Sequence, residues 1–422
     1  MTTEYPLESN SCLPYDLVVI LRGAGLAGTE RHTIDMVNHL VASGRRLAYV
    51  QAGIDLRAWG LNSAPDNLLV IPTSLPMRNL SRTETRAWSR LLKTLPAARV
   101  LLVKPWYFNA SIPLLRVLRK HYPLVYHIEH SWPPELEKRN SRLHLGFLPG
   151  IGLWWYREWW QRWRMSRTAD YVLAVSEAAR QALLRNALLG ETQVVTCPNG
   201  TNLDHWMPDK EAGGRFRRRY GIAEGAYLFG SVGRLVPLKG NDLAIRAFAR
   251  LRQVGLTDAA YCVIGEGPYR PELERLAREL DVADAVFFLE QIQDPRDAYS
   301  AIDTLLFPSV SGGEDSFPLV LGEAMACGCR VIASPVGGIP EVVGDPVCGE
   351  LLSTREPTEW AEAMARHLQT SYEERSRLGA QIRAFVERAH DQRLRLQWLE
   401  KVLFSSPSQL AELRLRYETD RG

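Results

Sequence analysis

Short apolar runs alternate with helical patterns along this chain, and this alternation restricts the fold more than any other feature. The first run covers residues 17–21, and apolar residues at helical spacing follow over about 29–43, before Gly44. Similar apolar runs lie at residues 47–50, 100–103, 124–127 and 171–175. Because strands that alternate with helices form parallel sheets covered on both faces, the first half predicts a Rossmann-like domain.

A second series of the same kind follows a break in the pattern. Residues 198–215 are rich in proline, glycine and polar side chains, which is typical of a linker. New apolar runs lie at residues 227–232, 261–264, 286–289, 304–307 and 330–333. The length of 422 residues suits two domains, so we predict an α/β protein whose two parallel sheets face each other across a cleft. The expected parts are residues 1–205, residues 206–390 and a helical tail over 391–422.

Composition and charge narrow the class of protein. Lys and Arg number 51 against 48 Asp and Glu, and a net charge of +3 gives no reason to expect nucleic acid as a partner. The six cysteines lack the spacing of a zinc site and suit reduced core thiols. The polar first residues do not resemble a signal peptide, and no run of about 18 apolar residues occurs. We therefore expect a cytoplasmic protein.

Residues 23–28 spell Gly-x-Gly-x-x-Gly between the first strand and the first helix. This spelling matches the dinucleotide fingerprint, which also needs an acidic residue at the end of the second strand. Gln51 stands there instead, and Asp55 lies beyond a glycine. Three interpretations stay open: a nicotinamide or flavin site, a tight turn that lets another ligand approach the backbone near Gly28, and a purely structural turn.

Two cations follow the first strand of the second series. Arg234 and Lys239 lie five residues apart in a loop that begins at Gly233. Ligands of open α/β sheets bind beyond the carboxyl ends of the strands, and a guanidinium with an ammonium can neutralise a diphosphate. A solvated loop with two unrelated cations is the alternative.

Two more turns follow strands of the second half. Gly265 and Glu266 open a small-residue turn on which a flat base could lie, although these residues alone favour an ordinary strand-to-helix turn. Further on, Glu314 precedes Asp315 and Glu323, and these last two lie eight residues apart around a predicted helix start. The N–H groups of a helix start bind sugar or phosphate oxygens, and carboxylates accept hydrogen bonds from hydroxyls. The alternative is a helix with an acidic first turn.

Taken in order, these motifs resemble the retaining glycosyltransferases of family 4, also called glycosyl transferases group 1, which have the GT-B fold. The resemblance covers about residues 17–400. It is carried by a Gly-Arg…Lys-Gly loop, a Gly-x-Gly turn, an acidic residue followed by seven others and a Glu, Ala-Met-Ala-Cys-Gly at 324–328 and Val-Gly-Gly-Ile-Pro-Glu at 336–341. The first half adds matches at residues 27–31, 175–178 and 198–200.

This resemblance implies a role for each motif. Arg234 and Lys239 would bind the donor diphosphate, and Glu323 would hold the nucleotide ribose. The first acidic position would contact the transferred sugar. That position is usually Glu and is Asp315 here, with Glu314 one residue earlier, so both carboxylates are catalytic candidates.

The helix start and a histidine complete the implied site. Phe317, Pro318 and Leu319 would lie beside the nucleotide and sugar, and Pro318 replaces a common glycine, so it supplies no N–H. The family also places a histidine on a loop of the first domain beside the sugar. His130 matches that position, with His127 as the lesser candidate, and a structural histidine is the alternative for both.

The expected function follows from this set. No Asp-x-Asp element occurs, so we expect a metal-independent enzyme without a cofactor, because the nucleotide sugar is a substrate. It would transfer a sugar with retention to an acceptor hydroxyl, in cell-surface polysaccharide or glycolipid synthesis. A nucleotide-sugar 2-epimerase of the same fold, a nicotinamide-dependent oxidoreductase and an inactive donor-binding module are the alternatives.

Tryptophans gather in one predicted helix. They are Trp154, Trp155, Trp159, Trp160 and Trp163. Such a face, with arginines roughly opposite, suits either a peripheral contact with the cytoplasmic membrane face or packing on the first domain.

Overall fold

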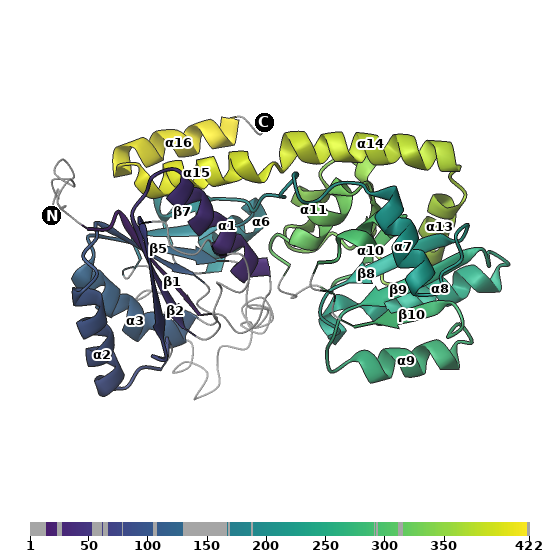
Figure 1. Ribbon diagram of the computed structural model, residues 1–422, viewed down its shortest axis with the longest axis horizontal. Coiled ribbons are helices and arrows are strands. Elements are labelled where there is room, and N and C mark those ends of the chain that lie inside the picture. Colours follow the sequence, from purple (N-terminus) through teal and green to yellow (C-terminus); the bar gives the residue numbers. More distant parts are fainter. Residues whose placement is uncertain are drawn as a thin grey trace, which may run out of the picture. The chain divides into compact units, whose positions relative to one another are not determined.

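The computed structural model describes most of the chain (Figure 1). The described residues are 14–22, 28–52, 61, 66–77, 79–103, 108–129, 167, 169–186, 189–290, 292, 294–310 and 315–419. The chain divides into two compact units, Met1–Pro198 with Leu396–Gly422, and Asn199–Arg395. The sequence had suggested a boundary after residue 205 and a separate tail, whereas the structure joins the chain from Leu396 to the first unit.

Seven parallel strands form the sheet of the first unit, in the order β3-β2-β1-β4-β5-β6-β7. The strands are β1 Leu17–Arg22, β2 Leu47–Ala52, β3 Leu68–Thr73, β4 Arg99–Val103, β5 Leu124–Glu129, β6 Tyr171–Ala174 and β7 Val194–Thr196. Most residues of these strands are apolar and buried, because a parallel sheet is covered by helices on both faces.

Helices cover both faces of this sheet. They are α1 Gly28–Ala42, α2 Arg82–Lys93, α3 Phe108–His121, α6 Glu177–Asn186, α15 Gln392–Phe404 and α16 Pro407–Thr419. Figure 1 shows α2 and α3 on one side, and α1, α15 and α16 on the other. Val18 and Ile20 of β1 share one core with Trp88 of α2 and Leu118 of α3. None of the helices that the structure describes is long and apolar enough to cross a membrane.

The end of the chain is held on the first unit by three kinds of contact. The Trp398 indole donates to the Thr196 carbonyl at 3.0 Å. Arg45 donates to Glu400 at 2.8 Å, and its guanidinium lies 4.1 Å from the centre of the Phe404 ring. These contacts connect residues far apart in sequence, which explains why the helical pattern alone suggested a separate helical tail.

The second unit has six parallel strands in the order β10-β9-β8-β11-β12-β13. The strands are β8 Tyr227–Val232, β9 Ala259–Ile264, β10 Val286–Leu289, β11 Thr304–Phe307, β12 Arg330–Ala333 and β13 Gly349–Leu351. The helices are α7 Lys210–Arg219, α8 Asn241–Gln253, α9 Arg270–Glu279, α10 Arg296–Ala301, α11 Leu319–Ala326, α12 Ile339–Val343, α13 Pro357–Leu368 and α14 Tyr372–Ala389. The prediction of two Rossmann-like domains with parallel sheets is confirmed.

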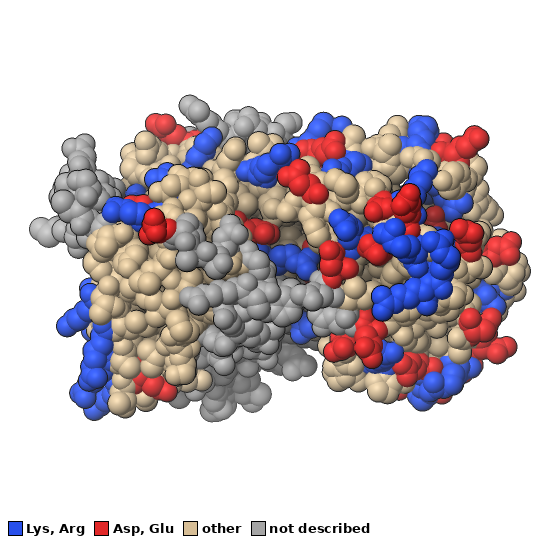
Figure 2. Space-filling model, in the orientation of Figure 1, with Lys and Arg blue, Asp and Glu red and all other residues tan. Residues whose placement is uncertain are grey.

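The registers of these strands bring several loops to one edge of the second sheet. Val232 pairs with Ile264, and Phe307 pairs with Ala333, so four strands end at nearly the same level. The loops that follow them therefore lie side by side at the carboxyl edge, where open α/β sheets bind ligands. Acidic and basic side chains are interspersed on the face of this unit in Figure 2, in keeping with the small net charge of +3.

Gly240 connects two of these loops and generates a stability prediction. Its φ is +67°, and a Cβ there would lie 2.0 Å from the Pro308 carbonyl oxygen. Gly221 has nearly the same φ, +69°, with no atom within 4 Å of the same position. Left-handed strain costs about 1–2 kcal/mol in both alanine variants. Gly240→Ala should lose about 1–3 kcal/mol more in urea unfolding followed by circular dichroism, because its backbone must shift. Equal losses in the two variants would contradict this packing.

Candidate functional site

The loop after β8 carries Arg234 and Lys239 and is fixed at both ends. The Leu235 N–H donates to the Glu266 carbonyl at 2.8 Å, and the Val310 N–H donates to the Leu238 carbonyl at 2.9 Å. A short 3-10 turn, Pro237–Lys239, ends at Gly240, where α8 begins. The loop is therefore held by its neighbours after β9 and β11, so the two cations stand on a supported backbone.

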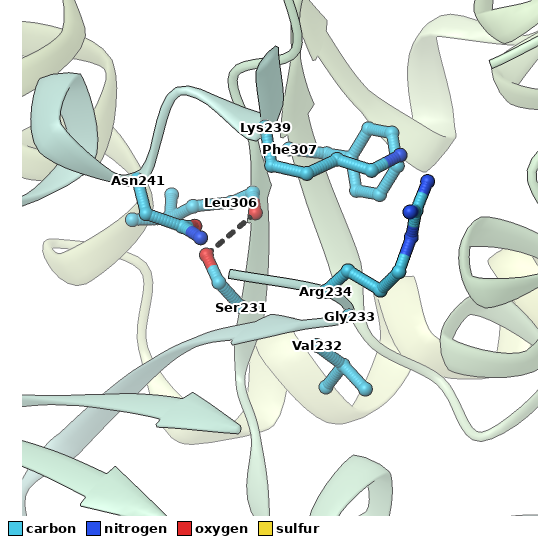
Figure 3. Close-up of a pocket in the computed structure, with 8 residues that line it drawn as sticks. All are labelled: Ser231, Val232, Gly233, Arg234, Lys239, Asn241, Leu306 and Phe307. Atoms are coloured by element: carbon cyan, nitrogen blue, oxygen red, sulfur yellow. Dashed lines mark hydrogen bonds between the residues drawn. The ribbon is translucent and has the colours of Figure 1, made fainter. Parts of the chain in front are cut away.

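A pocket opens between this loop and the ends of β8 and β11. Its lining is Ser231, Val232, Gly233, Arg234, Lys239, Asn241, Leu306 and Phe307, shown in Figure 3. The Lys239 and Arg234 side chains extend beside the Phe307 ring, and their charged ends lie on the same side (Figure 3). The space among these residues is small and opens to solvent.

Lys239 forms an ion pair with Asp315, which follows β11. The Lys239 side chain is 21% exposed and that of Asp315 only 7%. The ammonium also lies 5.2 Å from the centre of the Phe307 ring, at cation–π distance. The second carboxylate oxygen of Asp315 is buried and has no hydrogen-bond partner among the residues described. The sequence had made Asp315 and Glu314 the two candidates for the contact with the sugar, and the structure pairs the Asp315 carboxylate with Lys239.

Gly265 brings the next loop against the first. Its φ is +141°, and a Cβ there would lie 2.0 Å from the Gly233 carbonyl oxygen. The Glu266 side chain is exposed, while its carbonyl accepts from Leu235. Backbone packing therefore accounts for the glycine of this turn, independently of whether a base lies on it.

Glu323 lies inside α11 and is 6% exposed. The Tyr299 hydroxyl donates to one of its carboxylate oxygens at 3.0 Å. A buried carboxylate needs such partners, because removal from water is costly. Burial, and to a smaller degree the charge of Glu323, raises the pKa of the Cys327 thiol to about 12, so this thiol stays protonated at neutral pH.

The start of α11 is where the sequence placed further ligand contacts. Pro318 precedes the helix with φ −70°, and Leu319 is its first residue. Phe317 is 8% exposed, and its carbonyl accepts from the Asn199 amide at 3.4 Å. The Phe317 ring also meets His390 edge-on, with centroids 5.8 Å apart. The loop before α11 is thus held by the segment that enters this unit.

The remaining predicted site residues, apart from Glu314, belong to the first unit. Gly28 is exposed at the start of α1. His127 is fully buried in β5, as its position on the strand suggested. His130, Glu314, residues 23–27 and the tryptophans of 154–163 lie outside the described residues.

Several residues at these sites were not singled out from the sequence. Ser231, Asn241 and Phe307 are among those that line the pocket, and the Tyr299 hydroxyl donates to Glu323. Asn241 follows Gly240 directly, so its place at a helix start could have indicated it. The contact of Tyr299 with Glu323 joins α10 to α11, and no local pattern in the sequence indicates it.

The fold and the site define a GT-B protein with a cationic pocket in its second domain. Both halves of the chain match family models: residues 26–205 match Glycosyltransferase Family 4, and residues 214–385 match Glycosyl transferases group 1. The chain belongs to this family of glycosyltransferases, as the motifs had indicated.

Individual relatives agree with this assignment. D-inositol 3-phosphate glycosyltransferase of Actinosynnema mirum is 35% identical over 208 residues, covering 47% of this chain and 49% of that protein. A GDP-mannose-dependent alpha-(1-6)-phosphatidylinositol monomannoside mannosyltransferase of Mycolicibacterium smegmatis is 34% identical over 195 residues, covering 45% of this chain and 50% of that protein. The chain thus spans about half the length of the curated relatives it matches.

Solved structures share the fold along nearly the whole chain. Anabaena HepE in complex with UDP and glucose aligns with a TM-score of 0.73 at 18% identity, covering 93% of this chain and 100% of that one. A glycosyltransferase of Rickettsia africae aligns with a TM-score of 0.75 at 15% identity, covering 94% and 98%.

The Lys239–Asp315 pair predicts how the affinity for a diphosphate changes when the Asp315 carboxylate is removed. Asp315→Asn removes a negative charge beside the pocket, so repulsion of a diphosphate should fall. We expect UDP and GDP to bind about tenfold more tightly in calorimetry at low salt. Asp258→Asn makes the same charge change in an exposed residue before β9, at the opposite edge of the sheet, and should leave binding unchanged. Weaker binding in Asp315→Asn would refute the competition.

Proposed function

We propose that this protein transfers a sugar from a nucleoside-diphosphate sugar to an acceptor hydroxyl, with retention of the anomeric configuration. The observation that carries the proposal is the cationic pocket at the carboxyl edge of β8, beside the start of α8. Family membership supports the class of reaction. The finer points, retention and the identity of donor and acceptor, belong to the proposal.

The donor diphosphate would occupy the pocket with its oxygens on Arg234 and Lys239. Helix starts favour anions through their N–H groups and dipole, so the first turn of α8 adds to the two cations. When the diphosphate enters, Lys239 exchanges Asp315 for a phosphate oxygen. Asp315 is then released toward the transferred sugar, where carboxylates bind hydroxyls. Glu314 shares this proposed catalytic role, together with His130.

The chemical step follows from the same two cations. The acceptor oxygen bonds to the anomeric carbon on the side from which the phosphate leaves, and the bond from that carbon to the phosphate oxygen breaks. Arg234 and Lys239 stabilise the charge that develops on the departing phosphate. A phosphate oxygen takes the proton of the acceptor. Because two side chains neutralise the leaving group, we propose that the reaction needs no divalent ion, and chelation should leave its rate unchanged.

The acceptor is proposed from the relatives. One relative is named for D-inositol 3-phosphate and another for a phosphatidylinositol monomannoside. We propose a saccharide or lipid-linked acceptor, as in glycolipid or surface polysaccharide synthesis. Contact with anionic lipid through residues 154–163 belongs to the same proposal. Sedimentation with anionic vesicles tests it, and a protein that stays in the supernatant would remove it.

A thermal-shift screen of nucleoside diphosphates and their sugars tests the donor assignment. A ligand at 100 times its dissociation constant should add about 2.7 kcal/mol to the free energy of unfolding. Arg234→Ala and Lys239→Ala should each weaken binding by at least about tenfold, because a hydrogen bond to a charged group contributes about 1.5–3 kcal/mol.

Arg278→Ala, on the exposed surface of α9, is the matched control and should bind normally. Anomeric NMR of the product then tests retention. Normal binding by both pocket variants, or stabilisation by NADH in place of nucleotide sugars, would contradict the proposed function.

A further inference from the structure

Glu323 is a charged group placed where water hardly reaches. It lies in the middle of α11 with an exposed fraction of 6%, and the Tyr299 hydroxyl donates to it at 3.0 Å. Tyr299 itself is 1% exposed. A buried hydrogen bond to a carboxylate is strong and directional, so the phenol restricts the orientation of that carboxylate.

The ring and the backbone of Tyr299 are in turn held by other segments of the second unit. The Trp206 ring meets it edge-on, with centroids 5.6 Å apart. The Cys329 thiol donates to the Tyr299 carbonyl at 3.0 Å, and the Tyr299 N–H donates to the Pro295 carbonyl at 2.9 Å. Both the backbone and the ring are therefore fixed, and the hydroxyl has a defined place over Glu323.

The chemical type of this partner matters for what Glu323 can do. A phenol is neutral at physiological pH, so its hydrogen bond orients the carboxylate without cancelling the charge. The Tyr299 hydrogen bond therefore restricts the orientation of the Glu323 carboxylate and adds no charge of its own, which suits recognition of two neighbouring hydroxyls.

We propose that Tyr299 is a positioning residue that gives the nucleotide site its preference for ribose over deoxyribose. This inference rests on the proposed function, in which Glu323 accepts hydrogen bonds from the ribose hydroxyls. Tyr299 does not touch the nucleotide in this account. It acts through the carboxylate of Glu323. When the Tyr299 hydroxyl is lost, that carboxylate is still present but no longer has the orientation that the hydrogen bond gives it.

The test compares ribose and deoxyribose ligands in Tyr299→Phe. Calorimetry gives dissociation constants for UDP or GDP, whichever the protein prefers, and for the 2′-deoxy and 3′-deoxy analogues. The parent should bind the ribonucleotide at least about tenfold more tightly than one of the analogues. In Tyr299→Phe this ratio should fall at least threefold, while the affinity for inorganic pyrophosphate stays the same.

Tyr227→Phe is the matched control. Its hydroxyl is also buried and contacts Thr304 at 2.7 Å, away from Glu323, so its loss should change stability and leave the ribose ratio alone. Trp206→Phe gives a second reading that keeps the phenol but loosens its ring, and the ratio should fall there as well. This second variant decides the question if Tyr299→Phe is insoluble.

The possible outcomes distinguish the positioning role of Tyr299 from the proposed function of the protein. A parent that prefers ribose, with the same ratio in Tyr299→Phe and Trp206→Phe, would overturn the positioning role and leave the proposed function intact. A parent that binds nucleoside diphosphates without any ribose preference would overturn the role of Glu323 and this inference with it. A parent that binds no nucleotide would overturn the proposed function itself.

Discussion

The site depends on backbone packing between loops at the carboxyl edge of the second sheet. The loop after β8 contacts the loop after β9 at Gly265, and it contacts the loop after β11 at Gly240. The turn after β12 meets Asp315 in the same way, since a Cβ at Gly337 would lie 2.3 Å from the Asp315 carbonyl oxygen. A side chain at any of these three glycine positions would force the loops apart. The glycines therefore determine where Lys239 and Asp315 lie.

This backbone packing explains how the same pocket could exist both in the free protein and in the proposed complex with a diphosphate. In the free protein Asp315 neutralises Lys239 in a partly buried setting, where an unpaired charge is costly. In the proposed binding step, a diphosphate would offer the same lysine more negative charge, with Arg234 as a second partner. The exchange would require only side-chain movement, because the backbones on both sides are held by their neighbours. The proposed binding step thus follows from the packing and from simple charge balance.

Much of the fold could be predicted because it depends on local patterns. The long apolar runs, such as Tyr227–Val232, appeared as strands in the structure. The strands that were not predicted are β3, β7 and β13, of which Val194–Thr196 and Gly349–Leu351 have three residues each and give too short a pattern. Docking of the chain end on the first unit escaped prediction because Glu400 and Arg45 are 355 residues apart.

The site likewise has a part that the sequence could predict and a part that it could not. The motifs indicated Arg234, Lys239, Asp315 and Glu323, and the structure brings Lys239 and Asp315 into contact. That they form an ion pair could not be predicted, because the pairing depends on how β8 and β11 lie next to each other. Tyr299 is a similar case, since the sequence marks it only as one aromatic residue before a strand.

Hydrogen exchange with and without a saturating nucleoside diphosphate tests the central claim most directly. The account predicts that the largest slowing of amide exchange falls on residues 231–241, which line the pocket and begin α8. Slowing should extend to α11, where we propose that Glu323 binds the ribose. Slowing concentrated instead on residues 28–42 of the first unit, with none at 231–241, would contradict it.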